Sequence, residues 1–256
     1  MSTNNFIVDP AIAGDSIYID KLILSQLRLS KNASYPWFIL VPTVNWAFEA
    51  LEGENLGIIE EISELSQHQQ NQLQKEIYFI SQFLLSYFRP DKLNIANLGN
   101  IVPQLHIHLI ARFKNDPSFP KPIWGDCQVT KYEEVAENKL IKELQEFISN
   151  YSWFINVAEQ QNSLDLANDN TTTIKKQLRY RSNYRGCKET DFLIGCFADK
   201  FLKSSSEYED LNFAIFLNES DNEIYDWVIE KNQPPKNYKK IINLIKKHHQ
   251  ENQILL

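Results

Sequence analysis

Seven residues near the middle of the chain read Gln104-Leu105-His106-Ile107-His108-Leu109-Ile110. Apolar and polar side chains alternate here with the period of two that is typical of a β-strand, whose successive side chains point to opposite faces. We therefore predict a strand over residues 105–112. The leucine and isoleucine side chains at odd positions face a core, and Gln104, His106 and His108 lie together on the opposite, water-accessible face.

The segments around this strand predict an α+β domain with an antiparallel sheet. Short apolar or alternating runs at residues 37–41 and 92–96 indicate two further strands, and Gly99-Asn100 indicates a tight turn. Residues 66–88 predict a long helix that begins with a Ser-x-x-Gln capping box and carries one apolar stripe. A second helix is expected over residues 132–148.

The chain changes character after residue 150. Residues 151–173 are mostly polar and are interpreted as a linker between two domains. Residues 174–256 predict a small all-α domain of five short helices, with breaks at Arg185-Gly186 and Pro234-Pro235. The predicted organisation is thus an α+β domain over residues 1–150, a linker, and a helical domain.

Composition narrows the class of protein. With 256 residues, 43% hydrophobic and 23% charged, the chain is predicted to be globular. A net charge of −7 argues against a nucleic-acid-binding protein, and no apolar run is long enough to insert into a membrane. Three cysteines without CxxC spacing, and a polar start without a signal sequence, favour a reduced, cytoplasmic protein.

The residues alone leave three interpretations of the histidine pair open. Two imidazoles with Cβ atoms about 6–7 Å apart on a strand suit phosphoryl transfer, with one as nucleophile and the other as hydrogen-bond donor. The same spacing is common in zinc sites, although zinc requires a third or fourth ligand. The third interpretation is a pair of surface histidines without a chemical role.

A family resemblance favours the first interpretation. The sequence Leu93-Asn94-Ile95-Ala96-Asn97-Leu98-Gly99-Asn100-Ile101-Val102-Pro103-Gln104-Leu105-His106-Ile107-His108-Leu109-Ile110-Ala111-Arg112 resembles the histidine triad (HIT) superfamily of nucleotide hydrolases and nucleotidyl transferases. Pro120–Gly125 and Tyr35–Pro42 resemble one bacterial branch of it. The resemblance covers about residues 20–150. It implies that His106 forms a nucleotidyl-histidine, that His108 bonds the α-phosphate, and that the domain is a homodimer.

The chain also departs from the family pattern. Gln104 stands at the first triad position, where it supplies a hydrogen bond but cannot carry a proton. Ile101 replaces the hydroxyl residue that often assists the leaving group, and Asn32 lies where the family often has an acidic residue near the ribose. The expected nucleotide-binding residues are Asn32, Asn97, Gly99 and Asn100. No metal and no tightly bound cofactor are expected, and nucleotide binding is a safer expectation than fast turnover.

A second motif, Arg185-Gly186-Cys187-Lys188-Glu189, lies between two predicted helices. Gly186 can end the first helix, and Glu189 favours the positive end of the second. On these grounds alone the motif is a capping corner. The preceding basic stretch, with Tyr180 and Tyr184, is either a recognition surface for an acidic or phosphate-bearing partner or a solvated helix.

The context of this corner resembles the SdhE family, which promotes covalent attachment of FAD to the flavoprotein subunit of succinate dehydrogenase. The resemblance rests on Leu178-Arg179-Tyr180-Arg181-Ser182-Asn183-Tyr184-Arg185-Gly186-Cys187-Lys188-Glu189-Thr190-Asp191 and covers about residues 174–235. It implies that Arg185, Gly186 and Glu189 contact the flavoprotein, which receives FAD through its own residues. The chain is therefore interpreted as a fusion of two functions. The alternatives are a weak or non-catalytic nucleotide binder joined to a flavinylation factor, and a metal-binding scaffold.

Overall fold

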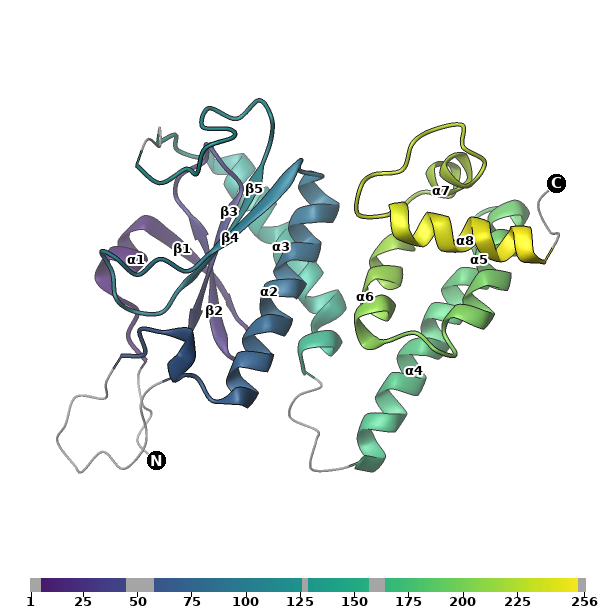
Figure 1. The fold of residues 1–256 in the computed structure, drawn as a ribbon, viewed down its shortest axis with the longest axis horizontal. Coiled ribbons are helices and arrows are strands. Elements are labelled where there is room, and N and C mark those ends of the chain that lie inside the picture. The colour runs from purple at the N-terminus through teal and green to yellow at the C-terminus, as the bar shows by residue number, and fades with distance from the viewer. Residues whose placement is uncertain (1–5, 45–57, 126–128, 157–163, 253–256) are drawn as a thin grey trace. The chain divides into compact units, whose positions relative to one another are not determined.

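The computed structural model of the protein describes residues 6–44, 58–125, 129–156 and 164–252. The chain divides into two units, Met1–Asn156 and Val157–Leu256. The first unit contains a sheet with helices, and the described part of the second contains helices without strands (Figure 1). The predicted fold class, an α+β domain with an antiparallel sheet followed by a helical domain, is confirmed.

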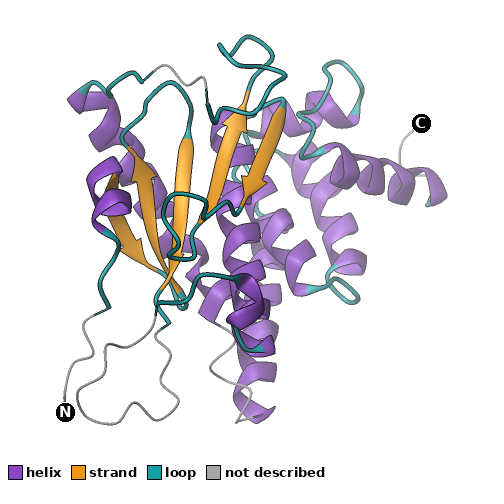
Figure 2. Cartoon of the chain, turned by 60° about the vertical axis from the view of Figure 1, so that its left-hand side comes forward, coloured by secondary structure: helices purple, strands orange, loops and turns teal. Residues whose placement is uncertain are grey.

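A five-stranded antiparallel sheet with strand order β1-β2-β3-β5-β4 forms the centre of the first unit (Figure 2). The strands are β1 (Ser16–Lys21), β2 (Ser25–Ser30), β3 (Trp37–Pro42), β4 (Lys92–Ala96) and β5 (Ile107–Arg112). β3 and β4 lie where strands were predicted. β5 begins two residues later than predicted because its ladder with β3 reaches only to Ile107, while the Leu105 amide bonds to the carbonyl of Ile59 instead.

The helices of the first unit are α1 (Pro10–Asp15), the short 3-10 helix η1 (Ile62–Glu64), α2 (Gln67–Phe88) and α3 (Glu134–Asn156). α2 begins with the predicted capping box, formed by Ser66 and Gln69. α3 was expected to end at residue 148, but it continues to Asn156. The extension follows from its buried face, which Tyr151, Phe154 and Ile155 prolong.

Both faces of the sheet are covered, and this determines the environment of the histidines. Phe38 faces α2, where its ring lies 5.9 Å from that of Phe83. On the other face, Ile12 of α1 packs against Ile39 and Val41 of β3. Figure 1 shows α1 on one side of the sheet and α2 with α3 on the other. Since Ile39 pairs with His108 across β3 and β5, the histidine face is the one that α1 covers.

Five helices form the described part of the second unit: α4 (Leu164–Asn183), α5 (Lys188–Phe201), α6 (Glu207–Phe216), α7 (Asp221–Val228) and α8 (Lys239–Glu251). α6 begins with a capping box of Ser206 and Glu209. The stretch 151–173, interpreted as a linker, includes the last residues of α3 and the first of α4. A polar composition is compatible with a helix as well as with a linker, so composition alone did not predict these helical residues.

Candidate functional site

The histidine pair lies at the start of β5. His108 is on the strand, His106 directly precedes it, and their ring centroids are 4.7 Å apart with the planes nearly perpendicular. The expectation of a water-accessible face is wrong, because each histidine is only 7% exposed and Gln104 only 3%. The pair is therefore brought together as predicted, but in a buried environment.

Aromatic side chains and the N-terminal segment account for this burial. The ring of His108 lies 5.2 Å from that of Trp37 and 5.6 Å from that of Trp124. Phe6 and Val8 pack against the cluster that α1 forms on β3. The period-two pattern identifies the face that the histidines share, but it cannot show which distant segments cover that face.

The ring of His106 is held by the backbone two residues upstream. Its Nδ1 lies 2.6 Å from the carbonyl oxygen of Gln104. A carbonyl oxygen only accepts hydrogen bonds, so Nδ1 carries the proton. In the neutral ring, Nε2 then carries a lone pair, which is the arrangement that a nitrogen nucleophile requires.

His108 has the opposite arrangement. The indole Nε1–H of Trp37 donates to its Nδ1 at 3.0 Å. Because that nitrogen accepts, the proton of the neutral ring is on Nε2, from which it can be donated. Burial, together with the neighbouring His106, lowers the pKa of His108 to about 3. His108 is thus a neutral hydrogen-bond donor near pH 7.

Gln104 binds the N-terminal segment. Its Oε1 accepts from the amide of Asp9 at 2.8 Å, and its Nε2 donates to the carbonyl of Ile7 at 3.0 Å. One lone pair and one hydrogen of the side-chain amide are therefore used within the fold. This contact links the first triad position to the segment that covers the histidine face.

The four predicted nucleotide-binding residues differ from one another in exposure and in hydrogen bonding. Asn32 is 7% exposed, and its Oδ1 accepts from the amides of Ser34 and Thr130, so it organises a turn. Gly99 has a φ of 70°, as its predicted turn requires, and Asn100 is exposed. The Oδ1 atom of Asn97 is buried and has no hydrogen-bond partner among the described residues.

The loop that carries Trp124 is anchored by a buried ion pair. Arg112 is 1% exposed and forms two contacts with Asp116, at 2.7 and 2.8 Å. Its guanidinium also donates to the carbonyl of Lys121 at 3.0 Å.

Residue-level reasoning missed Trp37 and Trp124 as site residues. The available signal was the position of Trp37 on an apolar strand, in phase with Ile39.

The zinc interpretation finds no support in the described part of the chain, where no three His, Cys, Asp or Glu side chains are grouped to hold a metal ion. Among the described helices, none combines the length and apolar character that crossing a bilayer requires.

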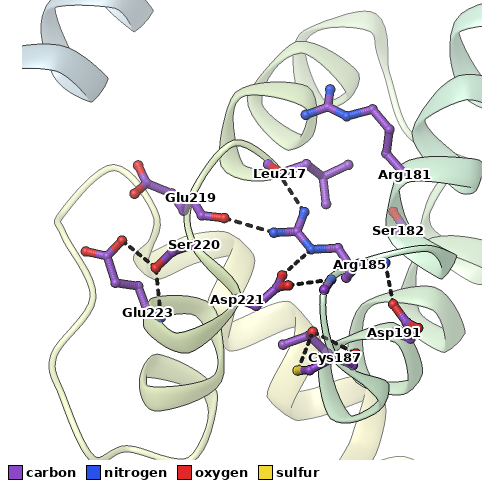
Figure 3. A network of polar contacts seen from close by, with 12 residues as sticks. Arg181, Ser182, Arg185, Cys187, Asp191, Leu217, Glu219, Ser220, Asp221 and Glu223 are labelled. Atoms are coloured by element: carbon purple, nitrogen blue, oxygen red, sulfur yellow. Dashed lines mark hydrogen bonds and ion pairs between the residues drawn. The ribbon is translucent and has the colours of Figure 1, made fainter.

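The second motif forms a buried polar network between the α4–α5 corner and the start of α7 (Figure 3). The Arg185 side chain is 8% exposed, and its Nε lies 2.6 Å from Oδ1 of Asp221. The guanidinium also donates to the carbonyls of Leu217 and Glu219, at 2.7 and 2.8 Å. The Gly186 amide donates to the other Asp221 oxygen at 2.6 Å. Sequence reasoning missed Asp221, which is distant in the chain.

The three predicted partner-binding residues therefore do not share one orientation. Arg185 is directed into the fold, Gly186 is exposed, and Glu189 is exposed in the first turn of α5. Tyr180 of α4 and Tyr184, which directly follows that helix, are 64% and 69% exposed, and their rings stack at 4.5 Å. This pair is an open aromatic surface at the end of α4, beside the corner.

Comparisons with known proteins assign the two units to different family models. A family model described as "HIT domain" matches residues 11–115, and one described as "Sdh5: Flavinator of succinate dehydrogenase" matches residues 176–249. The chain is similar to a solved histidine triad protein from Marinobacter aquaeolei VT8, with 34% identity, a TM-score of 0.50, and coverage of 57% of this chain and 97% of that one. A solved histidine triad (HIT) protein from Sinorhizobium meliloti 1021 is 33% identical, with a TM-score of 0.50 and coverage of 57% and 98%.

The curated relatives are assembly factors of succinate dehydrogenase, in agreement with the family model that matches residues 176–249. The mitochondrial succinate dehydrogenase assembly factor 2 of Dictyostelium discoideum is 28% identical over 79 residues, which are 31% of this chain and 56% of that protein. The mitochondrial succinate dehydrogenase assembly factor 2-A of Drosophila persimilis is 34% identical over 84 residues, which are 32% of this chain and 52% of that protein. The chain thus spans about half the length of these curated relatives.

Proposed function

Because the chain belongs to the histidine triad family through its first unit and carries a succinate dehydrogenase flavinator domain in its second, we propose that it joins two activities. The first unit is a nucleotide hydrolase or nucleotidyl transferase. The second is an assembly factor that promotes covalent attachment of FAD to the succinate dehydrogenase flavoprotein. The N-terminal proposal depends most on the opposite proton positions of His106 and His108.

These proton positions support a two-step transfer. Nε2 of His106 attacks the α-phosphorus of a nucleotide, the N–P bond forms, and the bond to the leaving-group oxygen breaks with its electron pair. Nε2–H of His108 donates to an α-phosphate oxygen, where charge develops. Water then attacks the same phosphorus, loses a proton to solvent, and releases the nucleotide as the N–P electron pair returns to His106.

Gln104 influences the choice of substrate in this mechanism. Its amide cannot transfer a proton to the leaving group. Leaving groups that depart as stable anions are therefore favoured, since they require no proton from the protein. A nucleotide ester of p-nitrophenol meets this requirement and is a suitable probe.

Hydrolysis of p-nitrophenyl AMP tests the N-terminal activity. We expect release of p-nitrophenolate by the full chain and its loss in His106→Ala, because that variant lacks the nucleophile. His68→Ala is the matched control, since His68 lies exposed on α2. No release by the unsubstituted chain would contradict catalysis.

The alternative is a nucleotide binder without turnover. It is favoured by the contacts of Gln104 with Ile7 and Asp9, which occupy part of the first triad side chain. Under this alternative, calorimetry detects AMP binding while p-nitrophenyl AMP remains intact. Detection of both binding and hydrolysis would exclude it.

The second unit acts through binding. By associating with the flavoprotein, it favours the conformer in which the flavoprotein's own residues attach FAD. Glu189 is the motif residue whose exposed carboxylate is best placed to contact this partner, and Arg185 supports the corner from inside. The FAD is thus a cofactor of the partner.

Complementation tests this second activity. In a strain that lacks its own flavinylation factor, we expect the full chain to restore covalent flavin on the succinate dehydrogenase flavoprotein, measured by in-gel fluorescence. Glu189→Ala should abolish the signal, whereas Lys203→Ala, at another exposed position, should not. Normal flavin with Glu189→Ala would contradict the assigned contact.

A further inference from the structure

The indole of Trp37 makes a directional contact with the histidine pair. Its Nε1–H lies 3.0 Å from Nδ1 of His108, and the two ring centroids are 5.2 Å apart. An indole nitrogen donates a hydrogen bond but cannot accept one. Nδ1 of His108 must therefore be unprotonated whenever this contact is formed.

The fold holds this indole from several sides. The backbone of Trp37 is paired with Ile110 in the β3–β5 ladder. Its side chain packs against the apolar cluster around Ile12 and against the cluster around Tyr35. The ring of Trp124 meets it edge-on at 6.4 Å. A side chain fixed by packing and a strand ladder is suited to orienting a neighbouring group.

We propose that Trp37 is a positioning residue for the histidine pair: its indole N–H keeps the proton of His108 on Nε2, while the neighbouring His106 keeps a lone pair on its own Nε2. The catalytic meaning of this role rests on the proposed nucleotidyl transfer. The role itself is a property of the free protein and is measurable without a substrate.

The neutrality of His108 matters for the covalent step. Once Nε2 of His106 is bonded to phosphorus while Nδ1 keeps its proton, the ring of His106 carries a positive charge. A second cation with its ring centroid 4.7 Å away would repel that charge in a site from which water is largely excluded. Protonation of His108 at Nδ1 also removes the acceptor for Trp37, so the contact and the neutral state favour each other.

Nitrogen NMR of the full chain labelled with ¹⁵N-histidine tests this inference directly. We expect the neutral His108 signal to show a protonated Nε2 and an unprotonated Nδ1, and we expect the opposite pattern for His106. A His108→Asn variant assigns the signals. Finding the His108 proton on Nδ1 in the unsubstituted protein would overturn the proposal.

The variant Trp37→Phe removes the donor. We expect His108 to lose its fixed tautomer, while His106 keeps the pattern set by its contact with the Gln104 carbonyl and so reports an intact fold. Trp124→Phe is the matched control, because Trp124 lies near the same ring, at 5.6 Å, and should leave the tautomer unchanged. An unchanged His108 pattern in folded Trp37→Phe would overturn the proposal.

A second replacement guards against misfolding. Benzothienylalanine at position 37 keeps the shape of the indole but has sulfur in place of the N–H group, and we expect the same loss of tautomer as in Trp37→Phe. The rate of p-nitrophenyl AMP hydrolysis should fall about tenfold, the order expected for one buried hydrogen bond. If the unsubstituted chain shows the expected tautomers but no hydrolysis, the proposed function fails while the positioning role stands. If the unsubstituted chain hydrolyses the probe but the His108 tautomer is unchanged in both position-37 variants, the positioning role alone is refuted.

Discussion

The histidine pair and the Arg185 corner are both buried polar motifs, but they differ in where their hydrogen-bonding atoms are used. At the histidine pair, the fold contacts Nδ1 of each ring and thereby decides whether Nε2 carries a lone pair, as in His106, or a proton, as in His108. At the corner, Arg185 is surrounded by Asp221 and two backbone carbonyls. The first arrangement prepares side chains for chemistry, whereas the second fixes the shape of a surface.

This difference predicts opposite responses to substitution. Residues of the histidine pair should affect activity more than stability, and residues that hold Arg185 should affect stability first and flavinylation as a consequence. The distinction is wrong if substitutions at the histidine pair mainly change stability, or if substitutions around Arg185 change flavinylation without changing stability.

The largest effect is expected at the histidine pair. His106→Ala should reduce p-nitrophenyl AMP hydrolysis on the order of 10³-fold or more, since the nucleophile is lost. The free energy of unfolding should change by no more than about 2 kcal/mol. Both are measured on the full chain, by absorbance and by urea denaturation. A destabilised protein with residual activity in proportion to its folded fraction would break the comparison.

The next effect is expected at the corner. Asp221→Ala should lower the free energy of unfolding of the second unit by about 3 kcal/mol, because it leaves a buried guanidinium without its carboxylate. Asp199→Ala is the matched control: it removes an exposed ion pair with Arg179, which should contribute less than about 1 kcal/mol. Denaturation followed by circular dichroism measures both variants. If the two variants lose equal free energy of unfolding, the burial of Arg185 does not strengthen its ion pair with Asp221.

Gly186 provides a sharper test of the same network. A Cβ atom at this position would lie 2.6 Å from Oδ2 of Asp221, so the carboxylate must shift away from Arg185. Gly186→Ala should therefore cost about 1–2 kcal/mol of unfolding free energy. Gly14→Ala is the control, because a Cβ there meets nothing within 4 Å. Equal melting temperatures for the two variants would contradict the tight packing of this corner.

The smallest expected effect is a pH dependence in the scaffold of the first unit. Burial raises the pKa of Glu76, whose Oε1 accepts from the amide of Leu24 at 2.6 Å. A raised folded pKa means that this contribution to stability is complete below the unfolded pKa of about 4.5 and is lost as pH rises through the folded value. Glu76→Gln should therefore stabilise the protein more at about pH 8 than at about pH 5.

Urea denaturation of both proteins at the two pH values measures this difference. It also separates titration of the scaffold from titration of His108, whose lowered pKa keeps that ring neutral across the same range. A stability difference between Glu76→Gln and the unsubstituted chain that does not change with pH would contradict the raised pKa.

Local patterns were sufficient to predict much of the fold. The apolar run of β3 and the capping box at Ser66 depend on neighbours close in sequence. Both elements could therefore be predicted from the local sequence alone. The helical residues within the stretch predicted as a linker could not be inferred from composition, because polarity does not distinguish a linker from a helix. The start of α4 at Leu164 shows this.

The candidate sites were predictable as residues but not as environments. The pairing of His106 and His108 follows from their spacing, whereas their burial depends on α1 and on the loop that carries Trp124, both distant in the chain. Asp221 lies 36 residues from Arg185, and nothing in either local sequence indicates that they meet. Long-range packing therefore decided what each motif can do.

Peptide-level mass spectrometry after rapid quenching of the full chain with p-nitrophenyl AMP tests the role of His106 most directly. We expect one adenylyl group on the peptide that contains His106, attached through an acid-labile N–P bond, and no adduct at this peptide in His106→Ala. Hydrolysis without an adduct at His106, or an adduct on another residue, would show that this imidazole is not the nucleophile.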